Sequence, residues 1–151
     1  MKKVFILMWV CFLSVALEAA FSQNAPGGSI KTGTLRVLID GFNSDKGDAR
    51  IALFNSMEGY KTDEKAFRQE AVRISNGKAE WALEDLPFGE YALKVFHDEN
   101  GNRKLDKNLF GAPTEAYGFS NNARATFGPP DFKKAAFKFD DPDMTVRISV
   151  Q

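Results

Sequence analysis

Seven short runs of residues alternate between apolar and polar side chains, and turn-forming residues separate them. Alternation with a period of two is the pattern of a β-strand with one buried face. In the clearest run, residues 34–39, Leu35, Val37 and Ile39 share one face. The other runs lie at residues 49–54, 71–75, 78–83, 90–97, 135–139 and 144–150. This pattern predicts an all-β fold, a single antiparallel β-sandwich of about seven strands.

Turn signals indicate how some of these strands are connected. Asn76-Gly77 stands between two alternating runs and is the strongest short-range signal for a β-hairpin. The polar segment 43–48 predicts that the strands on either side of it form a second hairpin. Within residues 56–69, Thr62 precedes a charged stretch, which predicts one or two helical turns with Thr62 as the N-cap.

The first 22 residues have the composition of a secretory signal peptide. Lys2 and Lys3 precede an apolar run over residues 4–17, and small residues allow cleavage after Ser22. A membrane anchor is the alternative, but the run is shorter than the roughly 20 apolar residues that cross a bilayer. A lipoprotein signal fits less well, because no small residue precedes Cys11. We therefore expect an exported protein, periplasmic or extracellular, whose mature chain has no transmembrane segment.

Cleavage at that point leaves about 130 residues, enough for one domain with its own core. Residues 23–33 are small and polar and predict a flexible lead-in, which assigns the sandwich to residues 34–151. Cys11 is the only cysteine, so the mature chain would lack disulfides and thiolate-bound metals. The chain has 20 basic and 20 acidic residues, a balance that argues against a nucleic-acid partner.

A polar loop after the strand at 90–97 has the composition of a calcium site. Its oxygen-bearing residues fall at positions one, three, five and nine, a spacing that directs several oxygens at one Ca²⁺ ion. The predicted metal ligands are the side chains of Asp98, Asn100, Asn102, Asp106 and Glu115 and the carbonyl group of Lys104. It is not an EF-hand, because Arg103 and Leu109 replace the required glycine and glutamate. The alternative is that these residues simply form turns, with basic neighbours balancing the charge.

The irregular segment 110–132 is a second candidate site. A long loop without secondary structure is usually functional or disordered, and this one is too aromatic for disorder. The predicted ligand-binding residues are Tyr117 and Phe119, as stacking groups, and Asn121 and Asn122, as hydrogen-bond partners of a sugar or peptide. The alternative is that the aromatic rings close one end of the sandwich, which is what we expect for Phe127 and Phe132.

His97, the only histidine, suggests an enzyme as the alternative function. It stands beside the polar loop, where it could act as a base with Asp98 or Glu115 in a small hydrolase or carbohydrate-active enzyme. The sequence places no nucleophile or second base beside it, so we expect a hydrogen-bonded residue at a strand end.

Several segments, taken in order, resemble one bacterial family. They are residues 86–92 (LPFGEYA), 97–102 (HDENGN), 105–106 (LD), 111–122 (GAPTEAYGFSNN) and 127–132 (FGPPDF). On these motifs, the chain from about residue 34 to 151 resembles the exported family catalogued as domain of unknown function 2141. The resemblance implies no biochemical activity.

The order of a Pro-x-Gly-x-Tyr turn, a strand and an acidic loop is also similar to prealbumin-like and collagen-adhesin B-type sandwiches. In those folds such loops can hold calcium. This similarity implies an immunoglobulin-like or prealbumin-like sandwich and says nothing of function. Together these features predict a non-enzymatic exported binding or structural domain, stabilised by Ca²⁺, that presents its aromatic loop to a protein or glycan partner.

Overall fold

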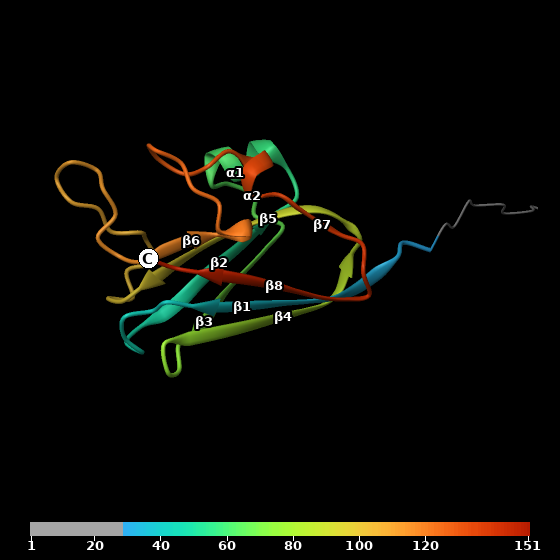
Figure 1. Cartoon of the computed structure of the whole chain (residues 1–151), viewed down its shortest axis with the longest axis horizontal. Coiled ribbons are helices and arrows are strands. Elements are labelled where there is room, and N and C mark those ends of the chain that lie inside the picture. Colours follow the sequence, from blue (N-terminus) through green and yellow to red (C-terminus); the bar gives the residue numbers. More distant parts are fainter. Residues whose placement is uncertain (1–28) are drawn as a thin grey trace, which may run out of the picture.

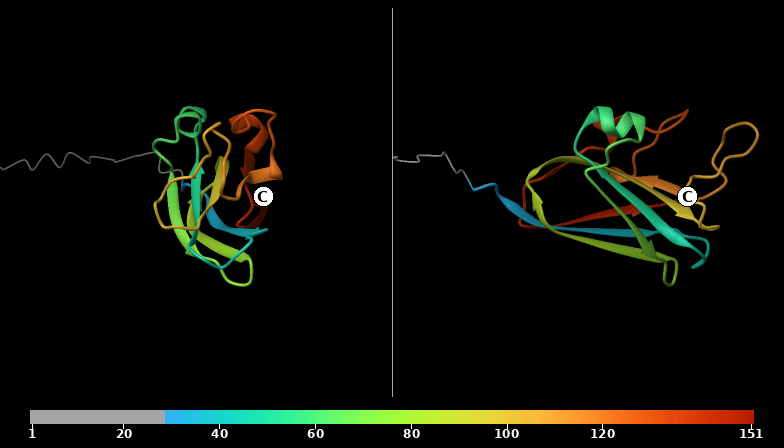
Figure 2. Two further views of the ribbon diagram at one scale, coloured as in Figure 1. Left: turned by 90° about the vertical axis from the view of Figure 1, so that its left-hand side faces the viewer. Right: turned by 180° about the vertical axis from the view of Figure 1, so that it is seen from behind.

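The structure, a computed structural model, describes residues 29–151. The predicted signal peptide, residues 1–22, and most of the lead-in lie outside the described residues. Within them, eight strands form two sheets that pack face to face (Figure 1; Figure 2). The strands are β1 (Thr32–Asp40), β2 (Asp48–Phe54), β3 (Arg68–Arg73), β4 (Lys78–Pro87), β5 (Gly89–Asp98), β6 (Tyr117–Phe119), β7 (Phe137–Phe139) and β8 (Asp143–Ser149). The predicted β-sandwich is confirmed.

The two sheets differ in size and in strand direction. In the three-stranded sheet, β1 lies in the middle, antiparallel to β4 and parallel to β8. The five-stranded sheet has the order β3-β2-β5-β6, and β7 pairs with the opposite end of β5 from β6. The β1–β8 pair departs from the predicted antiparallel arrangement, since the last strand runs alongside the first in the same direction.

The core between the sheets is built from the alternating apolar positions. Leu35 and Val37 of β1 are completely buried, and Ile148 of β8 packs beside them. At one end the hydroxyl of Tyr91 donates to the carbonyl of Pro87 at 2.8 Å and closes the turn between β4 and β5. Leu35, Val37 and Ile39 thus occupy the inward face that the alternation predicted for them.

Both predicted hairpins are wrong, although their turns form. Asn76 and Gly77 have φ angles of 53° and 70°, yet only Ser75 and Lys78 pair before β3 and β4 enter different sheets. β1 and β2 likewise belong to opposite sheets. The carboxylate of Asp45, in the β1–β2 connection, accepts the N–H groups of Asn76 and Gly77, in the β3–β4 connection, at 2.8 Å each. These hydrogen bonds tie together the two connections that cross from one sheet to the other.

Two short helices cover part of the outer face of the five-stranded sheet. The first, α1 (Met57–Thr62), begins after Ser56, whose hydroxyl accepts the N–H of Gly59, so the predicted N-cap at Thr62 is wrong. The second is α2 (Phe132–Ala135), which follows the 3-10 helix η1 (Ser120–Asn122). A second apolar cluster lies beneath them and comprises Phe54, Tyr60, Ala92, Phe119, Phe132 and Ala135. The expected burial of Phe132 is confirmed.

Residues 29–151 contain all of the strand pairs and both apolar clusters described above. None of the helices in this part of the chain has the length and apolarity needed to cross a bilayer.

Candidate functional site

The part of the outer face that the helices leave open is a groove of about 1340 Å³. Outward-facing residues of β2, β5 and β6 form its floor, among them Arg50, Lys94 and Tyr117. Its walls come from two segments that rise above this face of the sheet, the β5–β6 loop (residues 99–116) and the segment 123–131 (Figure 1). The groove is larger than the roughly 300–1,000 Å³ typical of small-molecule pockets, so it can accept a stretch of a polymer.

Strand alternation produces this floor. Along β2, Ile51 and Leu53 enter the core, so Arg50 and Ala52 face the groove. β5 follows the same rule, and Lys94 faces the groove between two core residues. The ammonium group of Lys94 donates to the carbonyl of Tyr60 at 2.6 Å and to Asp63 at 2.5 Å. Burial, together with nearby carboxylates, raises the pKa of the Tyr60 hydroxyl, so this ring stays neutral beside the ammonium group.

The groove carries an excess of positive charge. Its basic lining residues are Arg50, Lys94, Arg103, Lys104 and Lys107, against the acidic Asp63 and Glu70. Aromatic rings lie between them on both walls and on the floor, with Tyr117 half-buried and Phe110 exposed. An anionic ligand with faces that stack on aromatic rings matches this lining.

Of the four predicted ligand-binding residues, Tyr117 has a ring that a ligand in the groove can reach, whereas Phe119, Asn121 and Asn122 mainly make contacts within the domain. Tyr117 lies at the groove floor, edge to face with Phe119 at 5.9 Å between ring centroids. Phe119 also lines the groove, but it is only 8% exposed because its ring fills the second cluster, which leaves little of the ring for a ligand to stack on. The amide of Asn121 donates to a carbonyl just after α2, and the amide oxygen of Asn122 accepts an N–H of β8.

The expectation that the ring of Phe127 packs into the core is wrong. Phe127 is 91% exposed, at the tip of the segment 123–131. Neither this exposure nor that of Phe110 was predicted from the sequence, since composition does not tell which way a loop residue points.

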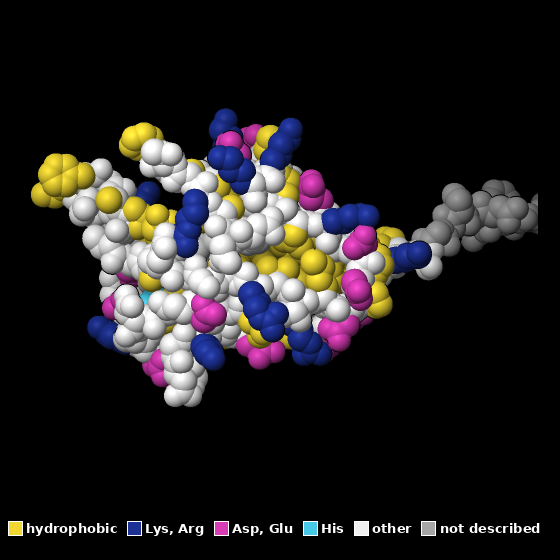
Figure 3. Space-filling view, viewed as in Figure 1, with side chains coloured by type: hydrophobic (Ala, Val, Ile, Leu, Met, Phe, Trp, Pro, Cys, Tyr) yellow, Lys and Arg dark blue, Asp and Glu magenta, His cyan; other side chains and the backbone are white. Residues whose placement is uncertain are grey.

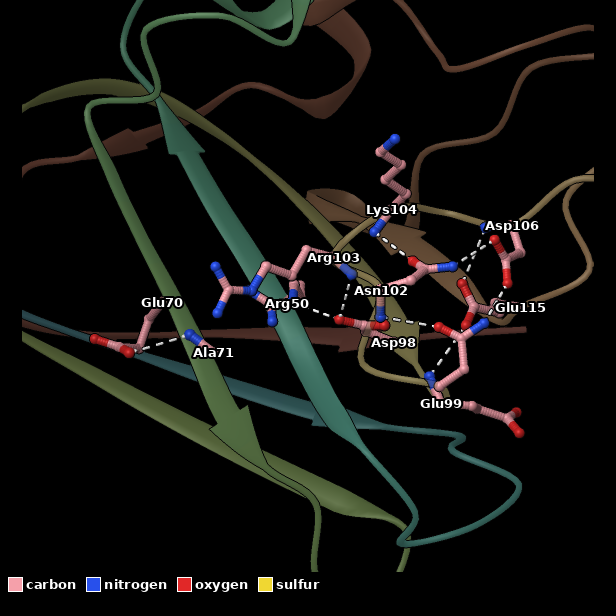
Figure 4. Close-up of polar contacts among 11 residues, drawn as sticks. Arg50, Glu70, Ala71, Asp98, Glu99, Asn102, Arg103, Lys104, Asp106 and Glu115 are labelled. Carbon is pink, nitrogen blue, oxygen red and sulfur yellow. Dashed lines mark hydrogen bonds and ion pairs between the residues drawn. The ribbon is translucent and has the colours of Figure 1, made fainter.

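Asp98 anchors the predicted calcium loop at the edge of the groove, and Figure 4 shows it between Arg50 and Arg103. Its Oδ2 accepts Nε–H of Arg50 at 2.7 Å and the backbone N–H of Arg103 at 3.0 Å. Burial would raise the pKa of this carboxyl, but Arg50 and the N–H groups of Arg103 and Gly101 outweigh it and lower the pKa below 3.8. The other oxygen, Oδ1, is buried and accepts no well-formed hydrogen bond from the described residues.

The loop after Asp98 is a series of side-chain turns. Oδ1 of Asn100 accepts the N–H of Asn102 at 2.9 Å, and Oδ1 of Asn102 accepts the N–H of Lys104 at 2.8 Å. Arg103 has a φ of 67°, the left-handed conformation for which calcium loops use glycine at this position. The carboxylate of Asp106 receives the side-chain amides of Asn100 and Asn102 at 2.6 and 2.8 Å.

Glu115 braces this loop from beneath. Its two carboxylate oxygens accept the backbone N–H groups of Glu99 and Asp106, each at 3.0 Å. Among residues 29–151, no three histidine, cysteine, aspartate or glutamate side chains lie together as a metal site. A cation bound here would therefore depend on Asp98 and Asp106 together with amide and carbonyl oxygens.

His97 faces away from the groove. Its Nε2–H donates to the carbonyl of Lys46 at 2.7 Å, and its Nδ1 lies 3.5 Å from the carboxylate of Glu99. Because successive residues of a strand point to opposite faces, Asp98 lies on the other side of β5. The structure therefore does not bring together the His97, Asp98 and Glu115 set that the alternative enzyme would require.

Comparisons with known proteins find one matching bacterial family and low similarity to structures of a pilus adhesin. The model of a family described as "Uncharacterized protein conserved in bacteria (DUF2141)" matches residues 37–147. No curated protein matches the chain. Two crystal structures of the pilus-presented adhesin Spy0125 (Cpa), one of a cysteine-to-alanine mutant, match at 15% and 16% identity with TM-scores of 0.25 and 0.26.

These structural matches cover 82% and 80% of this chain but only 28% and 27% of the adhesin chains. The chain thus spans less than a third of the adhesin, and similarity at this level carries no argument about function.

Proposed function

The chain belongs to the bacterial family described as "Uncharacterized protein conserved in bacteria (DUF2141)", and we propose that this member is a non-enzymatic exported domain that binds an anionic polymer. The ligand, an acidic stretch of glycan or polypeptide, lies in the groove on the outer face of the five-stranded sheet. The observation that carries this proposal is the groove itself, with five basic residues, two acidic residues and several aromatic rings around its lining.

The contacts of the floor residues support this role. Arg50 is held by Asp98 through Nε alone, which leaves the rest of its guanidinium group available to an acidic ligand. Tyr117 offers a half-buried ring as a stacking surface. On the exposed face of the other sheet, by contrast, Arg36 and Asp143 pair with each other at 3.5 Å.

Replacing Tyr117 with alanine tests the groove. We expect Tyr117→Ala to weaken capture of an immobilised panel of acidic glycans and acidic peptides by about tenfold or more, as for an aromatic binding residue. Its melting temperature should fall less than that of a core variant, because the ring is partly exposed and packs only at the margin of the second cluster. Thr145→Ala, on the exposed face of the other sheet, is the control and should bind as the parent does. Equal binding by both variants would reject the groove as the site.

We also propose that Ca²⁺ braces the loop that forms one wall of the groove. The unpartnered Oδ1 of Asp98, the oxygens of Asn100 and Asn102 and the carboxylate of Asp106 support it. The amide groups that now donate to Asp106 would have to turn their oxygens toward the ion. Bound calcium would stiffen the wall and place more positive charge beside the ligand.

Calcium binding is tested by thermal unfolding of chelated protein. At 100 times its dissociation constant, Ca²⁺ should stabilise the fold by about 2.7 kcal/mol, because it binds only the folded loop. Asp98→Ala should abolish this shift, and so should Asn102→Ala, which changes an exposed residue. A melting temperature that does not respond to saturating calcium would mean that hydrogen bonds alone hold the loop.

A further inference from the structure

Three large apolar side chains at the tips of two loops are almost completely exposed. The exposed fractions are 101% for Leu109, 94% for Phe110 and 91% for Phe127. Figure 3 shows apolar side chains at the ends of two segments that project from the body at the upper left. Single exposed apolar residues are common. Here, however, two loops that flank one groove both carry exposed apolar side chains at their tips, and exposed apolar surface of this kind is typical of an interaction site.

The first tip is an ordered turn. A β-bridge closes its base. Oδ1 of Asn108 accepts the N–H groups of Phe110 and Ala112 at 2.9 and 3.1 Å, and Gly111 supplies the left-handed conformation with a φ of 80°. Leu109 and Phe110 therefore point into solvent because the turn holds them there.

The second tip owes its shape to a glycine and two prolines. Gly128, with a φ of 66°, turns the chain directly after Phe127. Pro129 and Pro130 follow, and Pro130 is fully buried and anchors the end of the segment. The hydrogen-bonded turn at the first tip and the two prolines beside the second restrict the backbone there, which lowers the entropy lost when a surface binds the apolar side chains.

In the first of these loops, the β5–β6 loop, the basic side chains are more exposed to solvent than the acidic ones. Arg103, Lys104 and Lys107 are exposed. The acidic side chains are less exposed, and those of Asp106 and Glu115 are occupied by hydrogen bonds within the loop. The loop therefore presents positive charge behind an apolar tip, the combination that matches an anionic lipid surface.

We propose that the two tips dock this domain on an anionic lipid bilayer. Leu109, Phe110 and Phe127 enter the boundary between headgroups and acyl chains, and the exposed cations of the first loop meet the lipid phosphates. Projecting tips suit a surface that deforms around them, whereas a protein or glycan ligand suits the concave groove between them. Phe110 and Phe127 also line the groove, whereas Leu109 lies outside it. Tyr117 lies on the groove floor away from the tips, so variants at Leu109 and Tyr117 separate lipid docking from ligand binding.

The test is co-sedimentation of residues 29–151 with vesicles of phosphatidylcholine, with and without phosphatidylglycerol. We expect binding to the anionic vesicles. Phe110→Ser and Phe127→Ser should each weaken it by about tenfold or more, as expected for losing one buried aromatic anchor. Replacing both Lys104 and Lys107 with glutamine should weaken binding to anionic vesicles by about fivefold per charge.

Ile30→Ser is the matched control, since it removes a side chain that is 76% exposed, and should leave binding unchanged. Ile30 belongs to the segment that leads into β1, and this segment lies at the opposite end of the sandwich from the two loops (Figure 1). Tyr117→Ala should also leave vesicle binding unchanged. The absence of vesicle binding, or tip variants that bind as the parent does, would overturn the proposal. So would a dimer in light scattering that Phe110→Ser dissociates while vesicles remain unbound, because the tips would then join two copies of the chain.

Discussion

Replacing Arg50 with alanine should lower the free energy of unfolding by about 3 to 5 kcal/mol, as when one partner of a buried ion pair is removed. The side chain of Asp98 is 1% exposed, and Arg50 is the cation that its Oδ2 contacts at 2.7 Å. Without the guanidinium group, the carboxylate would remain buried with one N–H partner from Arg103. Urea unfolding at neutral pH measures this loss.

The pH dependence of stability should change sign in the same variant. In the parent, the pKa of Asp98 is lowered, so its stabilisation is complete above pH 3.8 and is lost as the pH falls through the folded-state pKa. In Arg50→Ala, burial would dominate and raise the pKa, so the variant should gain stability as the pH falls through it. Asp98→Asn added to Arg50→Ala should recover part of the loss. A cost under about 1 kcal/mol would mean that the pair behaves as a solvent-exposed one.

Replacing Phe119 with alanine should cost about 3 to 5 kcal/mol, the usual range for removing a buried phenylalanine ring. Its ring is 8% exposed and packs in the cluster that joins the helices to the outer face of the five-stranded sheet. The cavity cannot close easily, because the neighbouring Ser120 is fixed by hydrogen bonds to the N–H of Leu93 and the carbonyl of Ala135. Thermal unfolding of residues 29–151 measures the loss.

Tyr117→Ala is the matched comparison for Phe119→Ala, because the two rings lie two residues apart and touch edge to face. Tyr117 is half-buried and should cost much less stability while removing a ligand contact. Similar losses of stability in the two variants would show that Tyr117 also belongs to the core and would weaken the groove as a binding site.

Strand positions could be predicted from the sequence because alternation reports directly which side chains face the core. Leu35, Val37 and Ile39 illustrate this, since all three are buried as expected. Sheet membership could not be predicted in the same way. The turn at Asn76-Gly77 forms, but β3 and β4 then separate, because a local pattern does not specify which sheet a strand joins.

The candidate site was predicted only in part. The spacing from Asp98 to Asp106 predicted a calcium site, which stays a prediction, and the side-chain turns of the alternative interpretation do form. The role of Arg50 was missed, because 48 positions separate it from Asp98 and only strand pairing brings them together. Its one sequence signal is a charge within an otherwise apolar strand. Phe127 was expected in the core but is exposed, and Gly128 turns the chain directly after it.

The binding groove is tested most directly by a photoreactive amino acid placed at residue 71 of the full chain in living bacterial cells. Ala71 is exposed and lines the groove, whereas the control position, Thr145, is exposed on the other sheet. A diazirine side chain inserts into C–H bonds of proteins, glycans and lipids alike, so the probe does not presuppose the ligand. The proposed function predicts a covalent adduct from residue 71 and none from residue 145. Adducts from residue 145 alone, or equal labelling at both positions, would contradict it.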